Sequence, residues 1–262
     1  MQVIITESAA EVATLGADHI CRLLTSNPAA VLGLATGSTP IALYQQLIER
    51  YQQGQVSFAG VRSFNLDEYI GLQPDHPQSY RSFMNRHLFD QLDIQPGNTQ
   101  IPDGSKNPQS EALAYERLIQ QQGGIDLQLL GVGCNGHIGF NEPSSSLASR
   151  TRVKTLTAQT VRDNSRFFAA GEYQPQLAIT MGIATIMEAR QLLLLATGEH
   201  KASAVNALVE GPLSGHCPAS VLQQHPQALV IVDSAAGALL SQPDYFRRVR
   251  TETERMSLNH PV

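Results

Sequence analysis

Short apolar runs, each followed by small or polar residues, recur along the whole chain. These runs are rich in Val, Ile and Leu and show no regular apolar–polar alternation. Such runs are typical of strands that are buried on both faces of a parallel sheet. The predicted strands are Val3–Ile5, Val31–Ala35, Val61–Asn65, Leu127–Gly133, Leu177–Thr180, Leu192–Ala196 and Ala228–Val232.

The segments between these strands are long enough for helices, and several carry apolar residues at helical spacing. In Ala9–Leu24, for example, the apolar residues Val12, Leu15, Ile20 and Leu23 fit one helical face. The other predicted helices are Ile41–Tyr51, Tyr80–Phe89 and Pro108–Gln121. Strands that alternate with helices predict an α/β fold with a mostly parallel sheet covered on both faces. No Pro- or Gly-rich linker divides residues 1–262, so we expect a single domain.

Composition narrows the functional classes. With 42% hydrophobic residues the chain is globular, and a net charge of −5 argues against a broad surface for nucleic acid or anionic membranes. No apolar run approaches the roughly 20 residues of a membrane span, and the N-terminus lacks a signal-peptide pattern. Three scattered cysteines fit the reduced thiols of a cytoplasmic protein.

Ligands of such sheets gather outside the carboxyl ends of the strands. After the strand Val31–Ala35 comes Thr36-Gly37-Ser38-Thr39-Pro40, where we expect Thr39 to be the helix N-cap and Pro40 the first helical residue. The free N–H groups of this turn favour an anion such as phosphate, although an ordinary capped turn is the alternative. Lys201, after a second Ala-Thr-Gly sequence, is a candidate countercharge.

Acidic residues follow the strand Val61–Asn65. Asp67 and Glu68 come almost directly after it, so one carboxylate can face the pocket while the next points elsewhere. A partly desolvated carboxylate at a strand end is a candidate general base. The alternative is a pair of acids that complement a helix dipole.

A glycine-rich loop, Gly131–Pro143, follows the strand that begins at Leu127. It contains His137, which can take and give a proton near neutral pH, and Glu142, which can stabilise the histidine cation. Asn135 can hydrogen-bond but carries no charge. Cys134 is conceivable as a nucleophile, but its apolar neighbours favour a half-buried, inert thiol.

Three basic residues, Arg150, Arg152 and Lys154, alternate along the chain. On an extended segment they share one face, which predicts a basic patch in an otherwise acidic protein. This patch is a candidate second anion site or an ordinary exposed strand face.

Five motifs in one order, LGLATGSTP, FNLDEY, GHIGFNEP, SLASRTR and NSRFF, resemble the glucosamine-6-phosphate deaminase family. The resemblance covers nearly the whole chain. It implies a Rossmann-like three-layer fold that converts glucosamine 6-phosphate and water to fructose 6-phosphate and ammonia, without metal or organic cofactor.

The resemblance also implies roles for individual residues. His137, assisted by Glu142 and Asn135, corresponds to the group that opens the sugar ring, and Asp67 to the base that moves a proton from C2 to C1. The residues that correspond to the family's phosphate site are Thr36, Gly37, Ser38, Thr39, Arg166 and Lys201. In well-known members position 135 is aspartate, so charge support for His137 is reduced here.

Regulated members of that family are hexamers that bind N-acetylglucosamine 6-phosphate between subunits. The corresponding residues here are Ser145, Arg152, Lys154, Thr155 and Tyr245. The resemblance therefore implies an allosterically activated homohexamer with no nucleic-acid or membrane partner.

Two alternatives stay open. A 6-phosphogluconolactonase shares the fold and the phosphate loop, but it needs no acid placed like Asp67 to deprotonate carbon. A non-catalytic sugar-phosphate sensor normally carries a DNA-binding segment, for which we expect no room before the strand at Val3.

Overall fold

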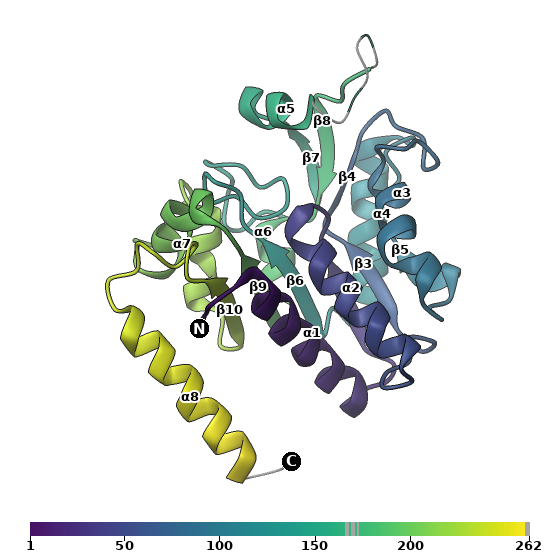
Figure 1. Cartoon of the computed structure of the whole chain (residues 1–262). Helices are drawn as coiled ribbons and strands as arrows, with labels where there is room; N and C mark the ends of the chain where they lie inside the picture. Colours follow the sequence, from purple (N-terminus) through teal and green to yellow (C-terminus); the bar gives the residue numbers. More distant parts are fainter. Residues whose placement is uncertain (166–167, 169–170, 172, 260–262) are drawn as a thin grey trace.

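Seven parallel strands form the main sheet of the computed structural model, which describes residues 1–165, 168, 171 and 173–259 (Figure 1). In sheet order they are β1 (Gln2–Thr6), β10 (Ala228–Asp233), β9 (Gln191–Ala196), β6 (Leu127–Gly131), β2 (Val31–Leu34), β3 (Arg62–Asn65) and β5 (Thr99–Gln100). The apolar runs explain this arrangement, because β9 and β10 are buried along almost their whole length. The mostly parallel sheet that the sequence predicts is confirmed.

Helices cover both faces of this sheet. On one face, Leu195 of β9 lies against Gly16 of α1 and near Leu43 of α2. On the other, the ring of Phe64 meets Tyr115 of α4 edge-on, at a centroid distance of 5.6 Å. The helices are α1 (Ala9–Ser26), α2 (Ser38–Gln52), α3 (Tyr80–His87), α4 (Pro108–Gln121), α5 (Ala158–Ser165), α6 (Ile183–Met187), α7 (Ala202–Val209) and α8 (Pro243–Asn259). Short 3₁₀ helices are η1 (Phe89–Gln91), η2 (Pro96–Asn98), η3 (Glu199–Lys201) and η4 (Pro218–Gln224). This is a three-layer α/β fold.

The first helix shows how local sequence sets these elements. Ser8 caps α1 by accepting a hydrogen bond from the Glu11 N–H at 3.2 Å. Val12, Ala17 and Ile20 on one side of the helix are fully buried. At roughly 25 cal/mol per Å² of apolar surface, this stripe supplies most of the stabilisation of the helix.

A second sheet of three antiparallel strands lies beyond the carboxyl ends of the main sheet (Figure 1). It contains β4 (Asp67–Tyr69), β8 (Leu177–Thr180) and β7 (Arg152–Thr155). The predicted strand Leu177–Thr180 exists, but it belongs to this sheet and not to the main one. Leu66 joins the two sheets, since its N–H donates to Leu34 O (3.1 Å) and its carbonyl accepts from Met181 N (2.7 Å).

The direction of winding reverses between β2 and β6. After β2 the chain adds β3 and β5 on one side, and β6, β9 and β10 then follow on the other. A crevice opens at such a switch point, outside the carboxyl ends of the strands. The segments that leave β2 and β6 are Thr36–Thr39 and Gly131–Pro143, so both candidate loops lie at this point. No helix in the described part of the chain is both long enough and apolar enough to cross a membrane.

Candidate active site

The loop after β2 differs from the prediction. Thr39 is not the N-cap, because α2 already starts at Ser38 and Gly37 occupies the cap position with φ 110°. Glycine adopts this left-handed backbone at little cost, which lets the helix begin earlier than Pro40 suggests. No side chain of the described residues caps this end. The first-turn N–H groups therefore stay available for an anion.

The turns that follow β2 and β9, each with an Ala-Thr-Gly sequence, lie close together. Ser38, Thr39 and Thr197 line one cavity of about 190 Å³ between α1, α2 and the end of β9. The rest of its lining is apolar and comes from α1, α2 and β9, so the cavity shows only that the turns after β2 and β9 lie close together.

Asp67, the first residue of β4, is buried with 6% of its surface exposed. Its carboxyl accepts a hydrogen bond from the Phe140 N–H, and a Cβ atom at Gly139 would lie only 3.2 Å from Asp67 Oδ2. Gly139 has φ 54°, and it lets the loop backbone approach the carboxyl. Burial and the neighbouring charge of Glu68 raise the pKa of Asp67 to about 8. The side chain thus faces the His137 loop, as a base acting with His137 requires.

Glu68 points away from this site. Its carboxylate accepts hydrogen bonds from the N–H groups of Tyr69 (2.8 Å), Tyr80 (2.9 Å) and Arg81 (3.0 Å). It therefore stabilises the start of α3, while Asp67 faces the loop. The sequence prediction that adjacent carboxylates serve different surroundings is confirmed.

Sequence reasoning missed Tyr80. Its hydroxyl donates to Tyr69 Oη (3.3 Å) and is hydrogen-bonded to the Thr36 side chain, and its ring stacks on Phe140. Burial and the nearby Tyr69 and Asp67 groups raise the pKa of Tyr80 well above its usual value, so the phenol is neutral. Tyr80 links the Thr36 loop to the surroundings of Asp67. Only its position after the cap Ser79 marks it in the sequence, and many helix starts share that feature.

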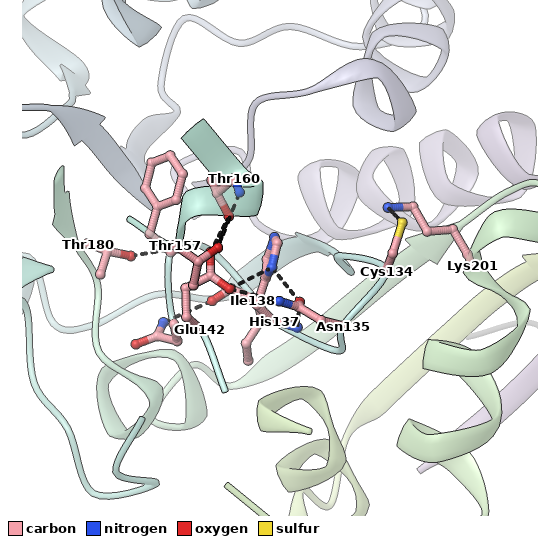
Figure 2. A network of polar contacts seen from close by, with 11 residues as sticks. Cys134, Asn135, His137, Ile138, Glu142, Thr157, Thr160, Thr180 and Lys201 are labelled. Carbon is pink, nitrogen blue, oxygen red and sulfur yellow. Dashed lines mark hydrogen bonds and ion pairs between the residues drawn. The ribbon is translucent and has the colours of Figure 1, made fainter. Parts of the chain in front are cut away.

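His137, Asn135 and Glu142 form one hydrogen-bonded group (Figure 2). Asn135 Nδ2 donates to Glu142 Oε2 (2.9 Å), and His137 Nδ1 lies 2.7 Å from Asn135 Oδ1. A carboxylate only accepts, so the amide nitrogen must face Glu142 and the amide oxygen must face the imidazole. Neutral His137 therefore carries its proton on Nδ1, which leaves Nε2 able to accept one.

Glu142 supplies negative charge to this group. Burial raises its pKa, but hydrogen bonds and the charge of His137, with hydrogen bonds from Thr160 and Asn135, outweigh burial and lower it to about 2. Its oxygen Oε2 lies 3.4 Å from His137 Nδ1. Glu142 is thus ionised across the physiological range and stabilises a protonated imidazole. In the described residues no three His, Cys, Asp or Glu side chains gather as a metal site.

Lys201 and Arg166 are the basic residues that the sequence predicts to bind the substrate phosphate. Lys201 ends η3, after the turn in which the Gly198 N–H donates to the Asp233 carboxylate at 3.0 Å. Arg166 lies outside the described residues.

The predicted effector residues lie on different elements and differ in their exposure to solvent. Arg152 and Lys154 alternate along β7, and Arg152 donates to Asn141 Oδ1 at 2.8 Å. Ser145 is buried, and its hydroxyl has no hydrogen-bond partner among the described residues. Thr155 at the end of β7 and Tyr245 on α8 are exposed.

Arg150 does not share the face of Arg152 and Lys154, so that prediction is wrong. It precedes β7, and its guanidinium pairs with Glu116 (2.6 Å) and Glu188. These carboxylates come from α4 and the end of α6, and they satisfy Arg150 locally.

Fold and site together place a buried carboxyl and a hydrogen-bonded histidine at the carboxyl edge of a parallel α/β sheet, where enzymes of this fold class bind their substrates. Residues 5–231 match the family model for glucosamine-6-phosphate isomerases/6-phosphogluconolactonase, and the chain belongs to this family. It is 63% identical over 256 residues to the glucosamine-6-phosphate deaminase of Hahella chejuensis (98% of each chain). It is 57% identical to that of Shewanella loihica (97% of this chain, 95% of the relative).

Solved structures agree with this membership. A monomeric glucosamine-6-phosphate deaminase matches with a TM-score of 0.88 and 42% identity, covering 91% of this chain and all of its own. The 6-phosphogluconolactonase of Trypanosoma cruzi has a TM-score of 0.75 at 22% identity, over 92% of this chain and 97% of its own. The latter likeness shows the fold alone.

Proposed function

We propose that this protein converts glucosamine 6-phosphate and water to fructose 6-phosphate and ammonia. The observation that carries the proposal is the buried carboxyl of Asp67 against the loop of His137, next to an uncapped helix N-terminus. The high identity to deaminases over nearly the full length supports it.

In this proposal the Thr36–Thr39 loop and the Lys201 ammonium, together with Arg166, bind the phosphate of the substrate. His137 Nε2 then accepts the proton of the C1 hydroxyl and returns it to the ring oxygen, which opens the ring. Asn135 holds the imidazole in the required tautomer, and Glu142 stabilises its cation.

The open aldose then presents its C2–H to Asp67. The ionised carboxylate takes this proton, an enolamine forms, and the protonated carboxyl delivers the proton to C1. Water adds to the resulting C2 imine and ammonia leaves, which yields the ketose. The substrate nitrogen helps to acidify C2–H, so a carboxylate suffices as the base.

Ammonia release from glucosamine 6-phosphate tests the proposal, with 6-phosphogluconolactone hydrolysis measured in parallel. We expect ammonia release in stoichiometric amounts with fructose 6-phosphate and no significant lactone hydrolysis. Lactone hydrolysis without ammonia release would show that the chain follows the other branch of its family.

Replacement of Asn135 by aspartate should retain measurable deamination but move the pH–rate profile to higher pH. The new carboxylate favours the protonated imidazole, and it removes the amide donor to Glu142. The measurement is kcat/KM between about pH 5 and pH 10, with Asn135→Ser as the uncharged comparison. A profile that superimposes on that of the wild type would remove Asn135 from the control of His137.

We also propose that N-acetylglucosamine 6-phosphate activates the enzyme at a site formed by Ser145, Arg152, Lys154, Thr155 and Tyr245. Two adjacent cations on β7 and the buried hydroxyl of Ser145, which has no partner among the described residues, support an anion site there. Arg152 also touches Asn141, the neighbour of Glu142, which provides a path to the catalytic loop.

The expected result of adding this effector is a lower substrate concentration at half-maximal rate, by about threefold or more. Arg152→Gln should abolish the response while the unactivated rate persists. Superimposed saturation curves with and without the effector would exclude the site.

Two further parts of the proposal concern assembly and location. A site between subunits requires an oligomer, and the resemblance to regulated hexameric members favours a homohexamer, although the similar solved deaminase at 42% identity is monomeric. The mass in solution from light scattering decides between the two. We propose that the enzyme works in the cytoplasm, where its three cysteines stay reduced.

A further inference from the structure

The loops after β6 and β9 are brought together by the sheet itself. These strands are neighbours, with Gly131 of β6 paired with Leu195 of β9. The loop after β6 carries Cys134, and the segment after β9 carries Lys201. Residues that are far apart in the sequence thus share one edge of the crevice.

Their side chains touch. Lys201 Nζ donates a hydrogen bond to Cys134 Sγ at 3.6 Å, apart from the His137 group in Figure 2. An ammonium group only donates, so the sulfur is the acceptor. Cys134 is exposed, which corrects the expectation of a half-buried thiol. The glycine-rich loop keeps the side chain at the surface, although the preceding strand is apolar.

The type of acceptor matters because of charge. Lys106 shows the usual arrangement, in which Asp103 at 3.2 Å and Glu111 at 4.0 Å compensate the ammonium charge. Lys201 forms no such ion pair with the residues that the structure describes, and a thiol orients its ammonium without cancelling the charge. An oriented but uncompensated cation suits the binding of a phosphate dianion.

We propose that Cys134 is a positioning residue that holds the Lys201 ammonium for the phosphate group of the substrate. It lies between Gly133, above which the His137 ring packs, and Asn135, which bonds to that ring. Cys134 therefore also fixes the Lys201 ammonium, which is proposed to bind the phosphate, relative to the His137 imidazole. This role rests on the proposed function, in which Lys201 binds the phosphate.

Cys134→Ala removes the acceptor and should raise KM for glucosamine 6-phosphate by about 3- to 10-fold, with kcat within about twofold of the wild type. Cys134→Ser keeps an acceptor and should stay within about twofold of the wild type in both constants. Cys21→Ala, which removes a thiol from α1, is the matched control. An unchanged KM in Cys134→Ala, an equal rise in Cys134→Ser, or a fall in kcat alone would overturn the proposal.

A thiol reagent gives a second readout that does not depend on deamination. Methyl methanethiosulfonate transfers its CH₃S group to a thiolate, forms a mixed disulfide and releases methanesulfinate. Burial raises the pKa of Cys21 and of Cys217, so the exposed Cys134 should react first.

Inorganic phosphate, bound by Lys201, should slow this reaction in the wild type, and Lys201→Ala should abolish the protection. If the wild type releases no ammonia but phosphate still protects Cys134, the proposed function is wrong. The contact between the Cys134 thiol and the phosphate-binding Lys201 ammonium is then still supported. Labelling of Cys134 that phosphate does not slow would overturn the proposal.

Discussion

Replacement of Asp67 by asparagine is expected to lower kcat for ammonia release by about 10³-fold or more, within the range for loss of a general base. Asparagine has nearly the same shape and still accepts the Phe140 N–H hydrogen bond, but it cannot take a proton from carbon. Substrate binding should change little, because the phosphate contacts are made elsewhere. The measurement is steady-state ammonia release, with kcat and KM determined separately.

Glu68→Gln is the matched control, since it makes the same chemical change at the next residue, whose side chain points toward the start of α3. Its kcat should fall by less than about tenfold. Equal losses in the two variants would indicate a general disturbance of β4 and would remove Asp67 as the base.

The pKa of Asp67 adds a pH dependence to this prediction. Because burial raises it to about 8, the base is protonated below that pH and wild-type kcat/KM should fall as pH decreases. The same shift affects stability with a defined sign. In the unfolded chain the pKa of this carboxyl is its ordinary 3.8, so the contribution of Asp67 to stability is lost as pH rises toward 8.

Asp67→Asn should therefore unfold at a higher temperature than the wild type at about pH 8, and the gain should shrink at about pH 4. Thermal unfolding at both pH values checks this. If Asp67→Asn were less stable than the wild type at about pH 8, burial would not destabilise the ionised carboxylate at this position.

His137→Gln should lower kcat by about 10²-fold or more, because glutamine hydrogen-bonds but does not shuttle a proton near neutral pH. The loss should be smaller than that for Asp67→Asn, since some sugar opens its ring in solution without the enzyme. His19→Gln on α1, where the imidazole bonds to Gln191 at 3.1 Å, provides a control for histidine loss outside the site. A kcat for His137→Gln within about threefold of that of His19→Gln would exclude His137 from ring opening.

Periodicity predicted the main sheet because strands such as β9 and β10 are buried on both faces and consist of continuous apolar runs. It missed β4 and β5, which have three and two residues, because so short a segment shows no recognisable pattern of hydrophobic residues. The start of α2 was misplaced since the freedom of Gly37 outweighed the signal of Pro40. Helix α8 carried no strong apolar pattern and was not predicted.

The candidate site was accessible from sequence where residues follow strands directly. Asp67 and His137 could be located this way, and the glycines around His137 indicated close packing. Tyr80 could not, because its place depends on how α3 is held against Glu68. The contact of Lys201 with Cys134 depends on strand order, which a single sequence does not reveal.

The two sheets described above have a consequence for substrate choice. Asp67 belongs to the small antiparallel sheet and the Thr36–Thr39 loop to the large parallel one, and Leu66 bonds to both. If these residues have the proposed roles, the distance between the Asp67 carboxyl and the Thr36–Thr39 loop selects substrates by the length of their carbon chain. A shorter amino sugar phosphate could place its phosphate in the Thr36–Thr39 loop or its acidic C–H at Asp67, but not both at once. The enzyme should therefore discriminate between substrates by chain length as well as by functional group.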